Sequence, residues 1–201
     1  RNEDRLRMIA DNLATACKVR TNELLALYMR GEGSTGTFYL KSTSPENTHI
    51  TVEGYSDGIG AITKQLQFME STYGAKYDRV TLNAVLLTVL TGEMNIPKAK
   101  KLLKAETGLK IDVDNGSYKQ RDMGKIVDRH YVGNDKLILS NSKFDKTDTF
   151  YFANLPLDSD EGEMGGLYGV QAYMTEDTAW VVIRGIPILT NPVAFSSIKF
   201  I

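Results

Sequence analysis

The chain has 201 residues, of which 42% are hydrophobic and 24% are charged, and its 24 Lys and Arg nearly balance its 25 Asp and Glu. This composition is typical of one folded domain, or of two small subdomains, and excludes a disordered or fibrous chain. The balance of charges argues against tight, salt-dependent nucleic-acid binding. No apolar run approaches the roughly 20 residues of a membrane-spanning helix. The single cysteine, Cys17, excludes an intrachain disulfide.

The first segment, residues 4–28, has the spacing of an amphipathic helix. Leu6, Ile9 and Leu13 recur at intervals of three and four, and Asn2 or Asp4 is available as a cap. The basic residues at 18 and 20 interrupt the apolar stripe, so two short helices or an arm carrying one helix remain alternatives.

Residues 31–54 have the pattern of an extended β-hairpin. After a glycine-rich stretch, the apolar segments 37–40 and 49–52 flank the polar tip 42–47. A lone two-stranded hairpin is barely stable in water, so we expect it to lie on another subunit.

A helix is predicted over residues 57–73, where apolar residues again recur at three and four and Gly74 follows as a stop. The next predicted elements are a buried strand at 79–82, a short helix capped by Asn83 and ended by Gly92, and a helix that begins at Pro97 and runs through 106.

Beyond Gly108 the apolar residues alternate, which predicts strands. We expect an Asn115-Gly116 turn and strands around 109–113, 118, 126–127, 137–139, 150–152, 168–173, 180–186 and 195–201. The sequence therefore predicts an α+β fold, with helices early and strands late.

Candidate catalytic residues are few. The chain has two histidines, His49 and His130, and neither lies in a recognisable catalytic motif. His130 is a candidate general base, with a surface or strand-end position as the ordinary interpretation. No histidine lies near Cys17 in the sequence, and a small buried residue is the ordinary role for it.

Other candidate binding residues have structural alternatives that we favour. An acidic run could hold calcium but lacks the EF-hand loop pattern; it comprises Asp158, Asp160, Glu161 and Glu163. The pair Gly58 and Gly60 could cradle a phosphate but is better explained as a joint. A solvated face better explains the lysine cluster (Lys98, Lys100, Lys101 and Lys104), and protein–protein anchors better explain the aromatic residues (Phe38, Tyr39, Tyr55 and Tyr77). We assign no catalytic, cofactor-binding or metal-binding residue.

Three sequence blocks carry a resemblance to a known family. They are the 108–113 segment Gly-Leu-Lys-Ile-Asp-Val, the 131–139 segment Tyr-Val-Gly-Asn-Asp-Lys-Leu-Ile-Leu, and the C-terminal third from Gly165-Gly166-Leu167-Tyr168-Gly169 through Asn191-Pro192 to Phe200. In this order the chain resembles the major capsid proteins of tailed phages and prophages with the Hong Kong 97-like fold, in the branch of the lambda-type head protein.

The resemblance implies a division of the chain. It predicts an N-terminal arm at 1–30, an E-loop hairpin at 31–54, a spine helix of the peripheral domain at 55–77, an axial domain at 78–167 and strands returning to the peripheral domain at 168–201. The chain departs from the family at the end of the E-loop, where members usually place a tryptophan or a similar aromatic residue and this chain has only Val52 and Tyr55. Some relatives crosslink a lysine to an asparagine, but no motif pairs Lys41 with Asn191, so no crosslink is assigned.

The implied function is structural, not enzymatic. The resemblance predicts a subunit that assembles through pentamers and hexamers into an icosahedral shell enclosing double-stranded DNA, in the bacterial host cytoplasm and then the virion. Expected partners are other copies of the chain, with scaffold, maturation protease and portal proteins as further candidates, DNA bound without sequence specificity, and no membrane. The chain begins at Arg1, and removal of a leading scaffold segment before it is left open.

Two other functions are carried as alternatives. An encapsulin-like nanocompartment shell shares the fold but encloses proteins, and a small α+β enzyme would show a pocket with a perturbed titrating group such as His130. A tail-tube component is disfavoured by the helices predicted at 57–106.

Overall fold

The computed structural model describes residues 45–114, 132–143 and 191–201 with their side chains. It also describes the backbone of 118–122, 125–129, 144, 150–154, 170–174, 179–183 and 185–189, and isolated positions before residue 31 (4, 8, 9, 11, 12, 15, 29 and 30). The chain divides into two compact units. We call Ala26–Thr149 with Leu189–Ile201 the sheet unit, and Arg1–Leu25 with Phe150–Ile188 the second unit.

The sheet unit is built on a five-stranded mixed sheet with the strand order β1-β11-β6-β2-β3. Its strands are β1 (His49–Val52), β2 (Arg79–Asn83), β3 (Lys110–Asp114), β6 (Lys136–Ser140) and β11 (Phe195–Phe200). β1 runs parallel to β11 and β2 parallel to β3, while β6 is antiparallel to both β11 and β2. The sheet therefore brings the last strand of the chain between β1 and β6, in its interior.

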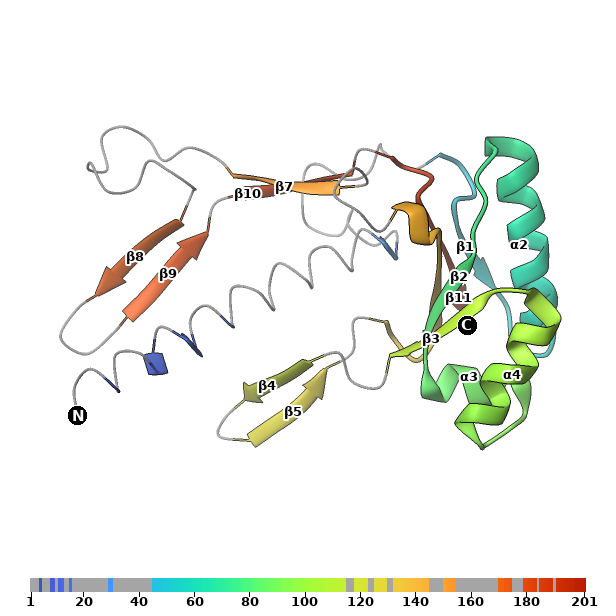
Figure 1. The fold of residues 1–201 in the computed structure, drawn as a ribbon, viewed down its shortest axis with the longest axis horizontal. Coiled ribbons are helices and arrows are strands. Elements are labelled where there is room, and N and C mark those ends of the chain that lie inside the picture. Colours follow the sequence, from blue (N-terminus) through green and yellow to red (C-terminus); the bar gives the residue numbers. More distant parts are fainter. Residues whose placement is uncertain are drawn as a thin grey trace. The chain divides into compact units, whose positions relative to one another are not determined.

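Three helices lie along one side of this sheet, as Figure 1 shows. They are α2 (Gly58–Tyr73), α3 (Ala84–Thr91) and α4 (Ile96–Thr107). Each ends at a glycine in the left-handed conformation, at Gly74, Gly92 and Gly108 respectively, where residues with a β-carbon are disfavoured. The helix stops that the sequence predicted are thus confirmed, and so is the cap of α3, because Asn83 Oδ1 accepts the Leu86 N–H at 2.8 Å.

The hydrophobic core lies between the helices and one face of the sheet. Every second strand residue points into it, as the alternation predicted, and α2, α3 and α4 contribute the other side. The fully buried members include Val80, Leu82, Leu137, Leu139, Ile198 and Phe200 from the strands and Ile62, Leu86, Leu87 and Leu103 from the helices. At roughly 1.5–3 kcal/mol for each large apolar side chain, their burial is the main stabilising contribution in this unit.

The remaining strands form two-stranded sheets. β4 (Tyr118–Asp122) and β5 (Lys125–Arg129) are antiparallel, as are β8 (Val170–Met174) and β9 (Ala179–Ile183), and β7 (Phe150–Asn154) lies beside β10 (Gly185–Leu189). The single strand expected over 180–186 is wrong. The chain there changes sheets between β9 and β10, which apolar alternation alone does not reveal because both strands continue it.

Three other predicted elements lie partly or wholly outside the described residues. Of the hairpin at 31–54, the strand at 49–52 is confirmed and pairs with β11, whereas its expected partner at 37–40 lies outside the described residues. Most of the N-terminal helix at 4–28 and the Asn115-Gly116 turn also lie outside them.

Candidate functional site

The sheet face away from the helices carries several polar contacts among the described residues, and we call it the polar face. Its strand residues alternate with those of the core and are mainly polar. They include His49 and Thr51 on β1, Ser197 and Lys199 on β11, Lys136 and Ser140 on β6, Arg79 and Thr81 on β2, and Lys110 and Asp112 on β3.

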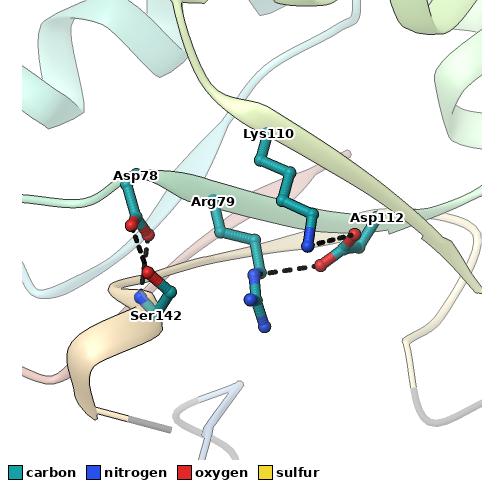
Figure 2. A network of polar contacts seen from close by, with 5 residues as sticks. All are labelled: Asp78, Arg79, Lys110, Asp112 and Ser142. Atoms are coloured by element: carbon teal, nitrogen blue, oxygen red, sulfur yellow. Dashed lines mark hydrogen bonds and ion pairs between the residues drawn. The ribbon is translucent and has the colours of Figure 1, made fainter.

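One polar cluster lies where β2 begins, as Figure 2 shows. The Arg79 Nε lies 3.0 Å from Asp112 Oδ2, and Lys110 Nζ lies 3.9 Å from the other carboxylate oxygen. Because β2 and β3 are parallel and Arg79 pairs with Lys110 in register, Arg79 reaches diagonally to the carboxylate two residues along. The Arg79–Asp112 pair joins the inner strand β2 to the edge strand β3, whereas Lys110 and Asp112 both lie on β3.

Asp78 fixes the short helix η1 (Ser142–Phe144) against the start of β2 (Figure 2). Its carboxylate accepts the Ser142 N–H at 2.8 Å and the Ser142 hydroxyl. These hydrogen bonds favour the charged form and hold the pKa of Asp78 below its usual range. Asp78 is exposed, and its lowered pKa makes the carboxylate a weak base for the Ser142 hydroxyl, so the arrangement stabilises a turn rather than prepares a nucleophile.

A second polar chain crosses the sheet at its β1 edge. The His49 Nδ1 lies 2.8 Å from Ser197 Oγ, and the Ser197 hydroxyl donates to the Arg30 carbonyl at 2.9 Å. Since the serine proton goes to Arg30, the histidine Nδ1 carries the hydrogen that Ser197 accepts. This places Arg30 against β11.

A histidine beside a serine is also the pairing of a base and a nucleophile, but this pair lacks the required properties. Burial, with a smaller effect of the Lys136 ammonium, lowers the pKa of His49 to about 4. Ser197 is only 2% exposed, and its hydroxyl is already committed to a backbone carbonyl. The geometry supports a structural role for both residues.

Gln65 forms a buried polar junction that sequence reasoning missed. Its Nε2 donates to the Asn47 carbonyl at 2.8 Å and to Ser196 Oγ at 3.0 Å, and Ser196 donates to the Thr48 carbonyl at 2.7 Å. Asn47 has a φ of 59°, a conformation that asparagine tolerates better than most residues. The junction ties α2, β11 and the segment entering β1.

A groove of about 350 Å³ opens between β1 and α2. Apolar side chains form much of its lining, and Glu53, Asp57 and Lys64 add charge, with Lys64 Nζ 3.2 Å from Asp57 Oδ2. Its residues are Ile50, Val52, Glu53, Ser56, Asp57, Ala61, Lys64, Gln65 and Phe68. We call this the β1–α2 groove.

The outward side of α3 is apolar, which is unusual for a surface helix. The helix contains no charged residue, and its outward residues Val85 and Val89 are 53% and 49% exposed. Met94, in the following loop, is 84% exposed. We call Val85, Val89 and Met94 the α3 face. A helix that is apolar all round is normally buried, so this surface is suited to a partner.

The glycine pair at the start of α2 has a packing role. A β-carbon at Gly58 would collide with Leu90 of α3, and one at Gly60 would collide with the Asp57 side chain. Gly58 is buried and begins the helix, so the close approach of α2 and α3 favours glycine at this position.

Other predicted residues have ordinary positions. On α4, Lys98, Lys101 and Lys104 are exposed, as a solvated face requires. Tyr55 stacks on Phe200 with ring centroids 5.5 Å apart, and the half-buried Tyr77 hydroxyl donates to the Val193 carbonyl at 2.7 Å. Burial raises the pKa of Tyr77. Both aromatic rings therefore pack within the subunit.

Several candidates lie outside the described residues. They are Cys17, Phe38, Tyr39, Lys41, His130, Asp158, Asp160, Glu161 and Glu163. Within the residues whose side chains are described, no group of three or more His, Cys, Asp or Glu is placed to hold a metal. The helices of that same part are each too short or too polar to cross a bilayer.

Comparison with known proteins adds information on the fold. No family model and no curated protein matches the sequence. A protein provisionally assigned as the capsid protein of a prophage of Escherichia coli CFT073 has a similar structure, with a TM-score of 0.55 and 14% identity over 100% of this chain and 69% of that one. At this identity the likeness concerns the fold alone.

Two further solved structures have lower scores. A phage-related protein from Bordetella bronchiseptica RB50 gives a TM-score of 0.46 and 15% identity over 79% of this chain, and the encapsulin of the holo-SrpI complex from Synechococcus elongatus PCC 7942 gives 0.43 and 8% over 95%. This chain covers 57% and 65% of their lengths. The chain thus has a capsid-like mixed α/β fold, with a five-stranded sheet and three helices in its described residues.

Proposed function

We propose that the chain is a capsid-type shell subunit, the major capsid protein of a tailed phage or prophage with the Hong Kong 97-like fold. The observation that carries the proposal is the fold similarity to the prophage protein across the whole chain. The order of elements fits it, since a long helix follows β1 and the last strand returns to pair with β1.

The subunit surfaces support assembly over catalysis. The described polar clusters bridge strands and turns, while two apolar surfaces, the α3 face and the β1–α2 groove, remain available to partners. Repeated contacts between unlike surfaces close into rings, and rings of five and six build an icosahedral shell. On this proposal 31–54 is the E-loop, α2 is the spine helix, 78–167 is the axial domain and 168–201 returns to the peripheral domain.

The proposal also specifies contents and partners. The shell encloses double-stranded DNA without reading its sequence, forms in the host cytoplasm and persists in the virion. Scaffold, maturation protease and portal proteins are the expected assembly partners. Near-balance of the 24 basic and 25 acidic residues suits a wall that holds packaged DNA weakly and lets it leave.

The test is to produce the chain in bacterial cells and image purified particles by negative-stain microscopy. Closed shells, or rings of five and six subunits, are the expected result for the chain produced alone. Particles purified from cells in which the phage replicates should in addition contain DNA that is protected from nuclease. Shells filled with a cellular protein would replace the phage function with a nanocompartment. A compact monomer at every concentration and salt would overturn the shell proposal.

A further inference from the structure

Two surfaces of the sheet unit have complementary shape. The α3 face projects from a helix that carries no charge, with Val85 and Val89 one turn apart so that their side chains lie together. The β1–α2 groove is concave, with Ile50, Val52 and Phe68 among its lining residues. A pair of branched apolar side chains is of a size that such a groove can bury.

The charges around the two surfaces are opposite. Segment 45–73, which forms β1 and α2, carries four carboxylates and one lysine: Glu46, Glu53, Asp57, Glu70 and Lys64. Segment 84–107, which forms α3 and α4, carries four lysines and two glutamates: Lys98, Lys100, Lys101, Lys104, Glu93 and Glu106. Contact between the two surfaces on different copies therefore brings acidic and basic regions together, which steers association.

The two surfaces are formed by different elements of the sheet unit. The groove is lined by β1, which is one edge strand, whereas α3 and α4 pack against β2 and β3, and β3 is the other edge. One copy cannot satisfy both of its own surfaces, but a neighbouring copy can occupy each of them. A contact of this head-to-tail kind repeats from subunit to subunit.

We propose that the α3 face of one copy docks in the β1–α2 groove of the next copy, and that this contact builds the ring. The occupant of the groove is thus a second copy of this chain. The inference rests on the proposed shell function and specifies which two surfaces meet.

The experiment uses two variants of the 201-residue chain that each disable one surface. The face variant is Val85→Glu with Val89→Glu, and the groove variant is Glu53→Lys with Ser56→Trp. All four positions are exposed, so folding is expected to persist and is checked by circular dichroism. The matched control is Gln67→Glu with Ser71→Glu, which places two carboxylates one turn apart on exposed α2 positions outside the groove lining.

Sedimentation velocity then measures the concentration at which half of the protein associates. We expect wild type and control to agree, and each surface variant to need a concentration at least about tenfold higher. The face variant puts two carboxylates into an apolar contact, and the groove variant fills the groove with an indole ring and reverses one of its charges. Mixing the two variants restores one intact face and one intact groove. The mixture should form one-to-one dimers and stop there.

Other results overturn the inference in distinguishable ways. If the face variant associates like wild type, or if the mixture stays monomeric while wild type assembles, the docking contact is wrong and the shell function stands. If the groove variant still dimerises while the face variant does not, α3 faces pair with each other. A monomeric wild type overturns both the inference and the proposed function.

Discussion

The two faces of the five-stranded sheet are organised by different physical effects. The face under the helices is held by burial of residues such as Leu82, Leu137 and Ile198, all 0% exposed. The polar face is held by specific pairs, including Arg79 with Asp112 and His49 with Ser197. Apolar burial is large and does not depend on the protonation of side chains, whereas the polar residues respond to pH and the ion pairs are screened by salt. The comparison predicts how each face responds to mutation.

The largest expected effect is on the apolar face. Leu137→Ala removes a fully buried side chain from the inner strand β6 and should lower the free energy of unfolding by about 2–5 kcal/mol, through lost burial and a cavity. Chemical denaturation of the isolated chain measures this. The matched control, Leu102→Ala on the outer side of α4, changes a side chain that is 47% exposed and should have a much smaller effect. Equal losses at the two sites would contradict the assignment of the core.

The next effect is a pH dependence of the polar face. The folded-state pKa of His49 is about 4, below the usual 6.5, so the unfolded chain binds a proton more readily between these values. Stability is therefore fully present above pH 6.5 and falls as pH decreases towards 4, by about 3 kcal/mol in total.

Urea denaturation at pH 7, 5.5 and 4 tests this, with His49→Gln as the comparison. All other titrating groups are common to both proteins, so the difference between the two profiles isolates the histidine. A His49→Gln profile parallel to that of wild type would show that His49 is not the group responsible.

A smaller effect is expected at the helix caps. Asn83→Ala removes the side-chain acceptor of the Leu86 N–H and should cost about 1–2 kcal/mol, because Asn83 is 2% exposed and water cannot readily replace it. Asn95 caps α4 through the Lys98 N–H at an exposed position, so Asn95→Ala should cost less, about 0.5–1 kcal/mol. Thermal denaturation of the two variants ranks them, and the reverse order would contradict the burial argument.

The smallest effect is expected at the partly exposed ion pair on the polar face. Asp112→Asn removes the negative charge that pairs with Arg79 and should cost no more than about 1 kcal/mol, because the Arg79 and Asp112 side chains are 22% and 37% exposed. The difference from wild type should shrink in 1 M salt, because screening weakens the pair that wild type retains. A large, salt-independent loss would indicate that the pair is part of the core.

The sequence predicted the apolar face well because its signals are local. Alternation in 109–113, the cap at Asn83 and the glycine at 74 each report on residues a few positions away, and all three elements form as expected. The order of the strands in the sheet, in contrast, depends on residues that are far apart in the sequence. The parallel pairing of β1 with β11 joins residues 148 positions apart, and no periodicity in either segment encodes it.

The polar contacts could not be predicted for the same reason. His49 is unremarkable in the sequence, and its depressed pKa depends on burial and on Lys136 from another strand. Gln65 looks like one more polar residue of an amphipathic helix, yet it is 4% exposed and bridges three segments. The α3 face had a local signal, because α3 lacks any charged residue, and that signal was available from the sequence.

The central claim is that this chain assembles with copies of itself through unlike surfaces. Its most direct test is the mass of wild-type particles by multi-angle light scattering across protein concentration and salt. The account predicts closed shells, or free rings of five and six subunits. A single 22.4 kDa species under every condition would contradict it.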